Sequence, residues 1–389
     1  MSPAAELQWI AAVAALACAL PGGFLLLRRQ ALLSDALSHS VLLGIVVAFF
    51  LLGSLDSPWL AAGASLSGLL MVLLVDLLQR GGRVKEDAAL GLVFPLLFSV
   101  AVILISRWAG HIHLDTDAVL LGELAFAPFR RLEWLGLDLP VALWQMGGLL
   151  LLNLGFLLLF WKELSLSAFD SLLAGSLGFR PALLHTLELG LLSLTCVAAF
   201  DAVGSVLVVA LIVTPAVTAR LLSDRLPSYF VWAALVAVLS SQLGWRLAVW
   251  LDASIAGSMA VAGGLLFTAA LLFSPRRGWV AGLRRERAQR RQFARRLLVI
   301  HLHNHEGTPQ EAEECRLAHL SEHLNWSAEI ARERVGLCLE SGWVSRDGER
   351  LSLTAAGRAA AQQALEELPL QLAGAREEGL LCPWPAPRI

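Results

Sequence analysis

The sequence predicts an all-α polytopic membrane helix bundle of about nine spans, followed by a small C-terminal α+β domain. Hydrophobic residues make up 57% of the chain and charged residues 16%, whereas a soluble domain is about 45–50% apolar and about 25% charged. The apolar residues form uninterrupted blocks, for example Trp9 to Leu27 and Trp59 to Leu78. Each block approaches the roughly 20 residues that a helix needs to cross a bilayer. A larger soluble core does not explain such blocks.

The apolar blocks define nine expected spans. The second is short and carries Asp35 and His39 at its start, and only Asp201 to Gly204 separates the sixth from the seventh. Met1 to Gln8 lacks the positive n-region of a cleaved signal peptide, so the first block is expected to be a retained span. The expected spans are 9–27, 38–54, 59–78, 89–107, 141–161, 184–201, 203–222, 229–251 and 257–274.

Basic residues give these spans an orientation. Loops on the cytoplasmic side of a membrane carry an excess of Lys and Arg, and here every odd-numbered span is followed by basic residues. Arg107, Arg130 and Arg131, near one outer loop, are the main exception. The pattern predicts an N-terminus outside and a C-terminus in the cytoplasm, and it favours nine spans over eight. The basic residues that follow the odd spans include Arg28, Arg29, Arg80, Arg83, Lys85, Lys162, Arg180, Arg220 and Arg225.

Two classes of chemistry find no support in the sequence. The five cysteines are scattered without a C-x-x-C pair, which disfavours a zinc knuckle or a disulfide framework. The chain has no G-x-x-x-x-G-K-[ST] motif, and its only lysines, Lys85 and Lys162, do not follow a glycine-rich loop. We therefore expect a protein that is not an enzyme and has no ATPase site, so active transport would need a separate ATPase or an ion gradient.

A carboxylate and an imidazole lie four residues apart at the start of the second span. Asp35 and His39 share one face of a helix at this spacing, and together they could bind a divalent metal such as Mn, Fe or Zn. Titratable groups inside spans are costly and point to function. The structural alternative is a helix N-terminus, with Ser34 or Asp35 as the cap and His39 at the membrane interface.

A second cluster of possible ligands follows the fourth span, in the segment WAGHIHLDTDAVLLGEL. His111, His113, Asp115 and Asp117 alternate there, and Glu123 lies in the apolar run that follows. The predicted orientation places them outside, where an arriving metal ion would meet them first. The alternative is a polar outer loop with helix-capping aspartates.

A short semi-polar segment joins the fifth and sixth spans. Phe169 and Asp170 are expected to open a short helix there, and Gly178 to end it. Such a helix, parallel to the membrane on the cytoplasmic side, could dock onto a cytosolic partner. An ordinary interfacial loop is the alternative.

Four segments, in order, resemble the permease family of manganese, zinc and iron importers of the ATP-binding-cassette type. The most specific is LLSDALSHSVLLGI, where the family reads DA-x-SH-x-V-x-PG. The others are KEDAALGLVF, AFDSLLAGSLG and VVALIVTPAVTARLL. The resemblance covers about residues 9–275. Leu43 departs from it, because the family usually has proline at that position.

The resemblance implies roles for the residues that carry it. Asp35 and His39 match the family's intramembrane metal-coordinating pair, and the segment from Phe169 to Gly178 matches the coupling helix that meets the ATPase. It also implies a homodimer or a sister permease, an extracytoplasmic solute-binding protein, and a bacterial inner-membrane location. No permanently bound cofactor is expected; the metal, Mn, Fe or Zn, is cargo. A proton-coupled secondary metal transporter and a membrane-tethered metal-responsive regulator are the alternatives.

The composition changes after the last span. We expect a permease domain at 1–275, a basic amphipathic linker helix at 276–298, a cytoplasmic domain at 299–368 and a disordered tail at 369–389. Nine arginines lie between Arg276 and Arg296, where they could meet anionic membrane lipid. A stop-transfer flank with a linker is the alternative for this basic segment.

The cytoplasmic domain has the element order of a winged helix. Helical patterns at Glu311–Leu324, Ser327–Glu340 and Leu351–Leu365, with a hairpin around Asp347-Gly348, resemble the N-terminal domain of metal regulators of the diphtheria-toxin-repressor type. However, 309–368 holds eleven acidic residues against six arginines, which makes DNA an unlikely partner. Binding of a protein or regulation of the transporter fits better.

Alternating histidines precede this domain. His301, His303 and His305 could bind a metal together with Glu306. A solvent-exposed polar hinge is the alternative.

Overall fold

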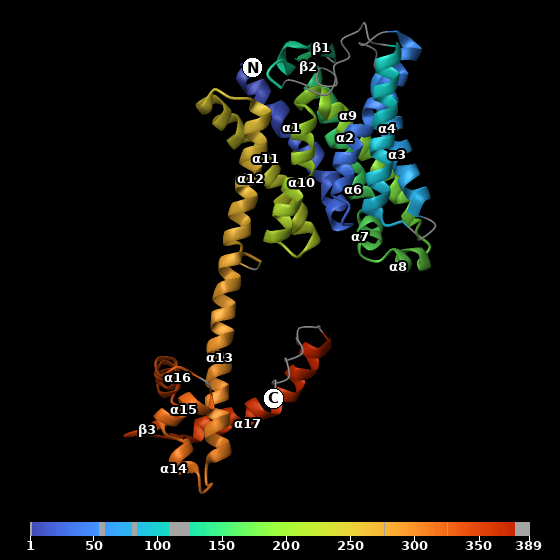
Figure 1. Ribbon diagram of the computed structural model, residues 1–389. Helices are drawn as coiled ribbons and strands as arrows, with labels where there is room; N and C mark the ends of the chain where they lie inside the picture. The colour runs from blue at the N-terminus through green and yellow to red at the C-terminus, as the bar shows by residue number, and fades with distance from the viewer. Residues whose placement is uncertain are drawn as a thin grey trace. The chain divides into compact units, whose positions relative to one another are not determined.

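The computed structural model describes residues 2–53, 59–79, 84–108, 124–134, 136–275, 277–324 and 326–377 (Figure 1). The chain divides into two compact units, Met1–Val280 and Ala281–Ile389. We call them the membrane unit and the C-terminal unit and treat each by itself.

The described part of the membrane unit is almost entirely helical. Nine of its helices are long and apolar enough to cross a membrane, as the sequence predicted. Its helices are α1 Pro3–Leu27, α2 Leu32–Leu52, α3 Trp59–Gln79, α4 Glu86–Trp108, η1 Ala127–Phe129, α6 Val141–Leu159, α7 Trp161–Phe169, α8 Ser171–Ser176, α9 Pro181–Val203, α10 Ser205–Leu222, α11 Leu226–Leu251 and α12 Ile255–Phe273.

Two span boundaries differ in an informative way from the sequence prediction. Helix α2 begins at Leu32, so the span is not short and both Asp35 and His39 lie inside it. Helices α9 and α10 are separated by Gly204 alone, whose φ of 85° lies in the region that favours glycine. A single residue therefore reverses the chain between two spans.

The helices of the membrane unit form two groups. Helix α1 is at the centre of the larger group, where it packs against α6, α9, α10 and α11. Small side chains along it, such as Ala11, Ala14 and Ala15, are fully buried and let the neighbouring backbones approach closely. The only tyrosine of the chain, Tyr229, reaches from α11 and donates a hydrogen bond to the carbonyl oxygen of Gly23, at 3.0 Å.

Helices α2, α3 and α4 form a second group, on which the Asp35/His39 pair lies. Helices α2 and α3 approach each other closely at Gly44 and Gly63, because a Cβ atom at Gly44 would collide with the Gly63 carbonyl. Helix α2 runs through Leu43 without a break, so leucine in place of the family's proline leaves the helix continuous.

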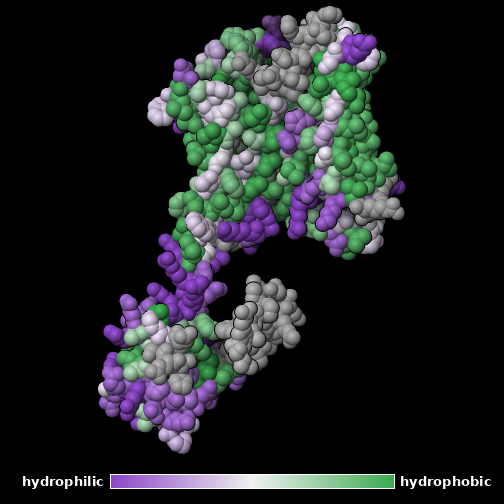
Figure 2. All heavy atoms as spheres, viewed as in Figure 1, coloured by the Kyte–Doolittle hydropathy of each residue, from purple (hydrophilic) through white to green (hydrophobic). Residues whose placement is uncertain are grey.

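Exposed apolar side chains cover the flanks of the bundle. Figure 2 shows hydrophobic residues over the flank formed by α3 and α4, where Leu66, Leu92 and Ile103 are each more than 60% exposed. In water this surface would be costly, whereas lipid tails cover it without penalty.

A short hairpin lies at the end of the bundle opposite α7 and α8 (Figure 1), and the sequence reasoning missed it. Strand β1, Arg131–Trp134, pairs antiparallel with β2, Leu137–Pro140. Arg131 is held by the buried Glu6 of α1 at 2.9 Å and by Asp138 at 2.8 Å; these two carboxylates raise the pKa of its guanidinium.

The C-terminal unit comprises most of a long helix and a small α+β fold. Its elements are α13 Trp279–His305, α14 Glu311–Glu314, α15 Leu317–His323, α16 Ala328–Glu340, β3 Val344–Asp347, β4 Arg350–Leu353 and α17 Ala355–Glu377. Leu298, Val299 and Leu302 of α13 are buried in its core with Leu320, Val335 and Leu351.

Three sequence expectations for this unit need correction. The helix expected at Glu311–Leu324 is two helices, because Arg316 adopts an extended conformation and forms a bridge with Arg350 beside the hairpin. The helix expected from Leu351 begins at Ala355, since Arg350–Leu353 is a strand. Helix α17 continues to Glu377, so residues 369–377 are helical rather than disordered; 378–389 lie outside the described residues.

Candidate functional site

Asp35 and His39 lie on one face of α2, as their spacing predicted. The His39 Nε2 atom is 3.9 Å from the Asp35 Oδ1 atom, and the side chains are 45% and 58% exposed. Helix α2 is capped by neither Ser34 nor Asp35, because it starts at Leu32 after Ala31, without a side-chain cap. The helix-cap alternative is therefore wrong for Asp35, whose carboxylate is left to act elsewhere.

Two aromatic rings of α4 hold the His39 imidazole in place. The ring stacks on Phe94 with centroids 5.8 Å apart and meets the edge of Phe98 at 5.7 Å. These rings fix one side of His39, while the Ser38 hydroxyl donates to the Asp35 carbonyl oxygen at 2.6 Å. The imidazole is thus oriented by apolar contacts that leave its nitrogens available as ligands or hydrogen-bond partners.

The pair lies in the first two turns of the span, with Asp35 in the first turn of α2. His39 is seven residues beyond the first residue of α2, which places it about 10 Å along the helix. One carboxylate and one imidazole supply two ligands suited to a divalent transition metal. Two ligands are fewer than the four that such ions commonly take, so these two side chains would need further ligands to hold an ion.

The second predicted cluster belongs to the segment that follows α4. His111, His113, Asp115, Asp117 and Glu123 lie outside the described residues.

Helix α8 is built by local capping signals. The Asp170 carboxylate accepts a hydrogen bond from the Leu173 backbone N–H at 2.9 Å, which makes Asp170 the N-cap. Gly178, with a φ of 87°, ends the helix. Phe169 is the last residue of α7 and so does not open α8 as expected. The segment thus holds a fixed helical turn between two spans.

The outer surface of this turn is apolar and exposed. Leu172 is 87% exposed, and Phe169 and Leu177 are 68% and 61% exposed. Figure 1 shows α7 and α8 at one end of the bundle, away from the β1–β2 hairpin. An apolar patch at the end of a membrane bundle is a typical protein-docking surface.

A buried ionic cluster joins helices at the end of the bundle that carries α7 and α8, and no sequence pattern predicted it. Arg28, at the end of α1, lies 3.3 Å from Glu188 of α9 and donates to the Ser167 hydroxyl of α7 at 3.0 Å. His185 lies 3.9 Å from Glu188 and 3.5 Å from Gln30. The cluster therefore links α7, which leads into α8, to two spans.

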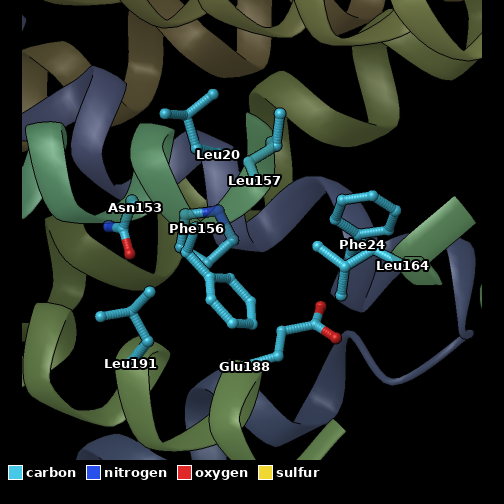
Figure 3. Close-up of a pocket in the computed structure, with 9 residues that line it drawn as sticks. Leu20, Phe24, Asn153, Phe156, Leu157, Leu164, Glu188 and Leu191 are labelled. Carbon is cyan, nitrogen blue, oxygen red and sulfur yellow. The ribbon is translucent and has the colours of Figure 1, made fainter. Parts of the chain in front are cut away.

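A small cavity adjoins the cluster (Figure 3). Its lining is apolar apart from Glu188 and Asn153. Asn153 donates hydrogen bonds to the Ala17 carbonyl oxygen and the Thr195 hydroxyl, both at 3.0 Å, as expected for an interhelical hydrogen bonder. Because the cavity volume is only about 20 Å³, it has no room for a hydrated ion. We assign the cluster a structural role.

Nine helices within the described residues could each cross a membrane, and one of them carries a carboxylate and an imidazole on the same face, which is typical of a membrane transport protein. The chain belongs to the ABC 3 transport family, which it matches over residues 5–274. It is 47% identical to the zinc transport system membrane protein TroD of Treponema pallidum, with 93% of this chain and 98% of TroD covered. It is 44% identical to the manganese transport system membrane protein MntD of Bacillus subtilis, with 69% of this chain and 92% of MntD covered.

A solved structure has the same fold. PsaBC from Streptococcus pneumoniae, in complex with Fab, matches with a TM-score of 0.59 and 26% identity, covering 71% of this chain and 94% of the matched chain. The match to TroD extends over 361 residues, more than the membrane unit contains, so the likeness reaches into the C-terminal unit.

Proposed function

We propose that this chain is the permease subunit of an ATP-driven importer of divalent transition metal ions, Mn, Fe or Zn. The observation that carries the proposal is the Asp35/His39 pair inside α2, with ligand atoms 3.9 Å apart and both side chains accessible. Intramembrane carboxylate and imidazole groups mark ion pathways. The names of the zinc and manganese transport relatives support the same class of cargo.

We propose that helix α8 couples the permease to a separate ATPase subunit. Its rigid capping by Asp170 and Gly178 and its exposed apolar surface, with Leu172 most exposed, suit a helix that transmits movement between two proteins. The Arg28 cluster supports this role, because it ties α7 to α1 and α9.

The end that carries α8 faces the cytoplasm in this proposal, with the N-terminus of α1 outside. The alternating helix directions gather Arg28, Lys162, Arg180 and Arg225 at this end, as in cytoplasmic loops. At the other end, the exceptional Arg130 lies 3.2 Å from Asp201 and Arg131 is held by two carboxylates. Both arginines are engaged with carboxylates, and the proposed orientation rests on the excess of basic residues at the end that carries α8.

A second permease completes the site in this proposal. The Asp35/His39 face supplies two ligands and is about half exposed in a single chain. A second copy, or a sister permease with the same pair, would bring the number of metal ligands to four and cover the exposed face. An extracytoplasmic solute-binding protein would deliver the ion to the outer end.

The C-terminal unit is proposed to be a winged-helix domain that binds protein rather than DNA. Helices α15 and α16 with the β3–β4 hairpin support that shape. In this arrangement α16 would be the DNA-reading helix, but its Arg334 donates to the Arg290 carbonyl oxygen of α13 at 3.1 Å. Its Glu333 lies 3.8 Å from Arg291. A helix that is acidic in part and engaged with α13 is poorly suited to the DNA groove.

The test is ion uptake in vesicles by this chain, co-expressed with a partner ATPase and a solute-binding protein. We expect Mn, Fe or Zn to accumulate only with ATP, and Asp35→Ala and His39→Ala to abolish uptake. Asp252→Asn is the matched control, because Asp252 is an exposed helix C-cap in the left-handed region, which asparagine tolerates. Normal uptake by both site variants would reject the ion site, and uptake by this chain alone with a proton gradient would favour a secondary transporter.

A further inference from the structure

The histidines at the end of α13 do not act as the alternating group that the sequence suggested. Residues two apart in a helix point in different directions, whereas residues four apart share a face. Accordingly, the rings of His301 and His305 lie side by side, with centroids 4.7 Å apart. His303 lies on another face, where its Nδ1 atom is 3.9 Å from the Glu306 carboxylate.

Glu314 completes a group of three with His301 and His305. It is the last residue of α14, which the turn after α13 brings back alongside the helix. Each residue offers one ligand atom, and all three atoms lie within 4.8 Å of one another. Within the part of the chain that the structure describes, this is the one group of three or more His, Cys, Asp or Glu side chains that converges in this way.

The neighbouring carboxylates are already committed to arginines. Glu306 is hydrogen-bonded to Arg358 at 2.9 Å, which lowers the pKa of its carboxyl group. Glu311 accepts from the Gly307 N–H and from Arg350, both at 2.9 Å, and these bonds lower its pKa as well. The interactions fix the turn between α13 and α14, which places Glu314 beside the two histidines.

One ring nitrogen of His301 faces a backbone oxygen. Its Nε2 atom is 3.3 Å from the Glu314 carbonyl oxygen, so in this contact Nε2–H is the donor and Nδ1 carries the lone pair. Metal-ligating histidines commonly donate their second N–H to a backbone carbonyl in this manner, which sets the tautomer and the ring orientation. The partly buried position of all three residues also limits competition from water.

We propose that His301, His305 and Glu314 form a divalent-metal site in the C-terminal unit, separate from the Asp35/His39 pair. Two imidazoles and a carboxylate favour Zn²⁺ or Co²⁺ over Mg²⁺ or Ca²⁺. Three protein ligands leave a coordination position for water, unlike a closed structural site with four protein ligands.

The binding test uses the full-length chain, purified without a histidine tag, with Co²⁺ as the probe. The Asp35→Ala/His39→Ala variant serves as the background, so that the membrane pair does not contribute. In this background we expect His305→Ala and, separately, Glu314→Gln to lower the affinity of one Co²⁺ site by roughly tenfold or more. Each variant should also lose the visible absorption of Co²⁺ bound at that site. His303→Ala and Glu313→Gln are the matched controls, and both should bind as the background does.

A measurement on the wild-type chain guards against misfolded variants. Zn²⁺ should protect His301 and His305, but not His303, from modification by diethyl pyrocarbonate, as read by peptide mass spectrometry. Equal protection of all three histidines, or of none, would overturn the site. Unchanged Co²⁺ binding by both ligand variants would overturn it too.

A sensing role for this site rests on the proposed function, which places the C-terminal unit in the cytoplasm, where the imported ion arrives. Ion bound there would then slow further import. In proteoliposomes with the ATPase, we expect Zn²⁺ on the C-terminal side to inhibit wild-type uptake and to inhibit the His305→Ala variant several-fold less. Equal inhibition of both would reject the sensing role. Absence of uptake by wild type as well would instead count against the proposed transport function.

Discussion

The Arg28 guanidinium lies 3.3 Å from the Glu188 carboxylate, with side-chain exposures of only 13% and 6%. The two residues come from the end of α1 and the first turns of α9. Removing one partner of a buried ion pair leaves an uncompensated charge, which commonly costs about 3–5 kcal/mol, whereas replacing both by apolar residues is often neutral. The pair therefore makes α1 and α9 depend on each other at the end of the bundle that carries α8.

We expect Glu188→Ala to destabilise the membrane unit by about 3 kcal/mol, because it leaves Arg28 buried without its counter-charge. The double variant Arg28→Met/Glu188→Leu should recover most of that loss. Unfolding by denaturant in detergent micelles measures both. Additive losses in the double variant would show that the two side chains do not stabilise the fold as a pair.

A substitution on the outer face of α8 should disturb coupling to the ATPase without disturbing folding of the permease. Leu172 is 87% exposed, so Leu172→Asp is expected to leave thermal stability within about 0.5 kcal/mol of wild type. If α8 docks onto the ATPase, a buried charge at that contact should abolish co-purification of the two subunits and ion uptake. Leu172→Met keeps the apolar character and is the control. Full uptake by Leu172→Asp would place the ATPase contact elsewhere.

The contact of the His39 ring with Phe98 predicts a partial loss of transport when the aromatic ring is removed. Phe98 of α4 meets the His39 ring edge at 5.7 Å, so Phe98→Ala frees the imidazole to adopt other rotamers. We expect uptake to fall several-fold, mainly through a higher concentration of ion at half-maximal rate, with normal expression. Phe98→Tyr keeps the ring and should transport close to wild type. If Phe98→Ala transports normally, the ring is not needed to position His39.

The features that sequence reasoning recovered are local in the chain. Asp35 and His39 share a face because their spacing matches the helical period, and α8 is bounded by Asp170 and Gly178 because capping residues act within a few positions. The nine spans follow from apolar blocks whose length the bilayer dictates. Each of these signals can be read within one window of sequence.

The features that sequence reasoning missed depend on contacts between residues that are distant in the chain. Nothing near Arg28 indicates that Glu188 will neutralise it, and no local pattern assigns Glu314 to His301. The split of α14 from α15 has the same origin, because the strand-like conformation of Arg316 is set by its bridge to Arg350. Pairings of this kind are fixed by tertiary packing, which overrides helical propensity.

The close approach of α2 and α3 should make Gly44 sensitive to substitution, whereas Gly91 of α4 should tolerate it. A Cβ atom at Gly44 would collide with the Gly63 backbone, whereas a Cβ atom at Gly91 of α4 would meet nothing within 4 Å. Gly44→Ala should therefore destabilise the unit by about 1–3 kcal/mol as the helices separate, and Gly91→Ala should be neutral or slightly stabilising. Thermal unfolding of both variants in detergent distinguishes the two cases, and equal effects would contradict the α2–α3 contact.

Burial of Cys338 in the C-terminal unit predicts that its thiol reacts slowly with alkylating reagents. The side chain is fully buried, and desolvation raises its pKa from 9.0 to about 11. Because the thiolate is the reactive form, only about one molecule in a thousand would be reactive at pH 8, compared with about one in ten for a thiol of pKa 9. We expect iodoacetamide to label Cys338 at least about 100-fold more slowly in the folded chain than in denaturant, since the lower thiolate fraction and the lack of access act together. Peptide mass spectrometry follows this residue individually, and rapid labelling of the folded chain would mean that α16 does not pack against the core through Cys338.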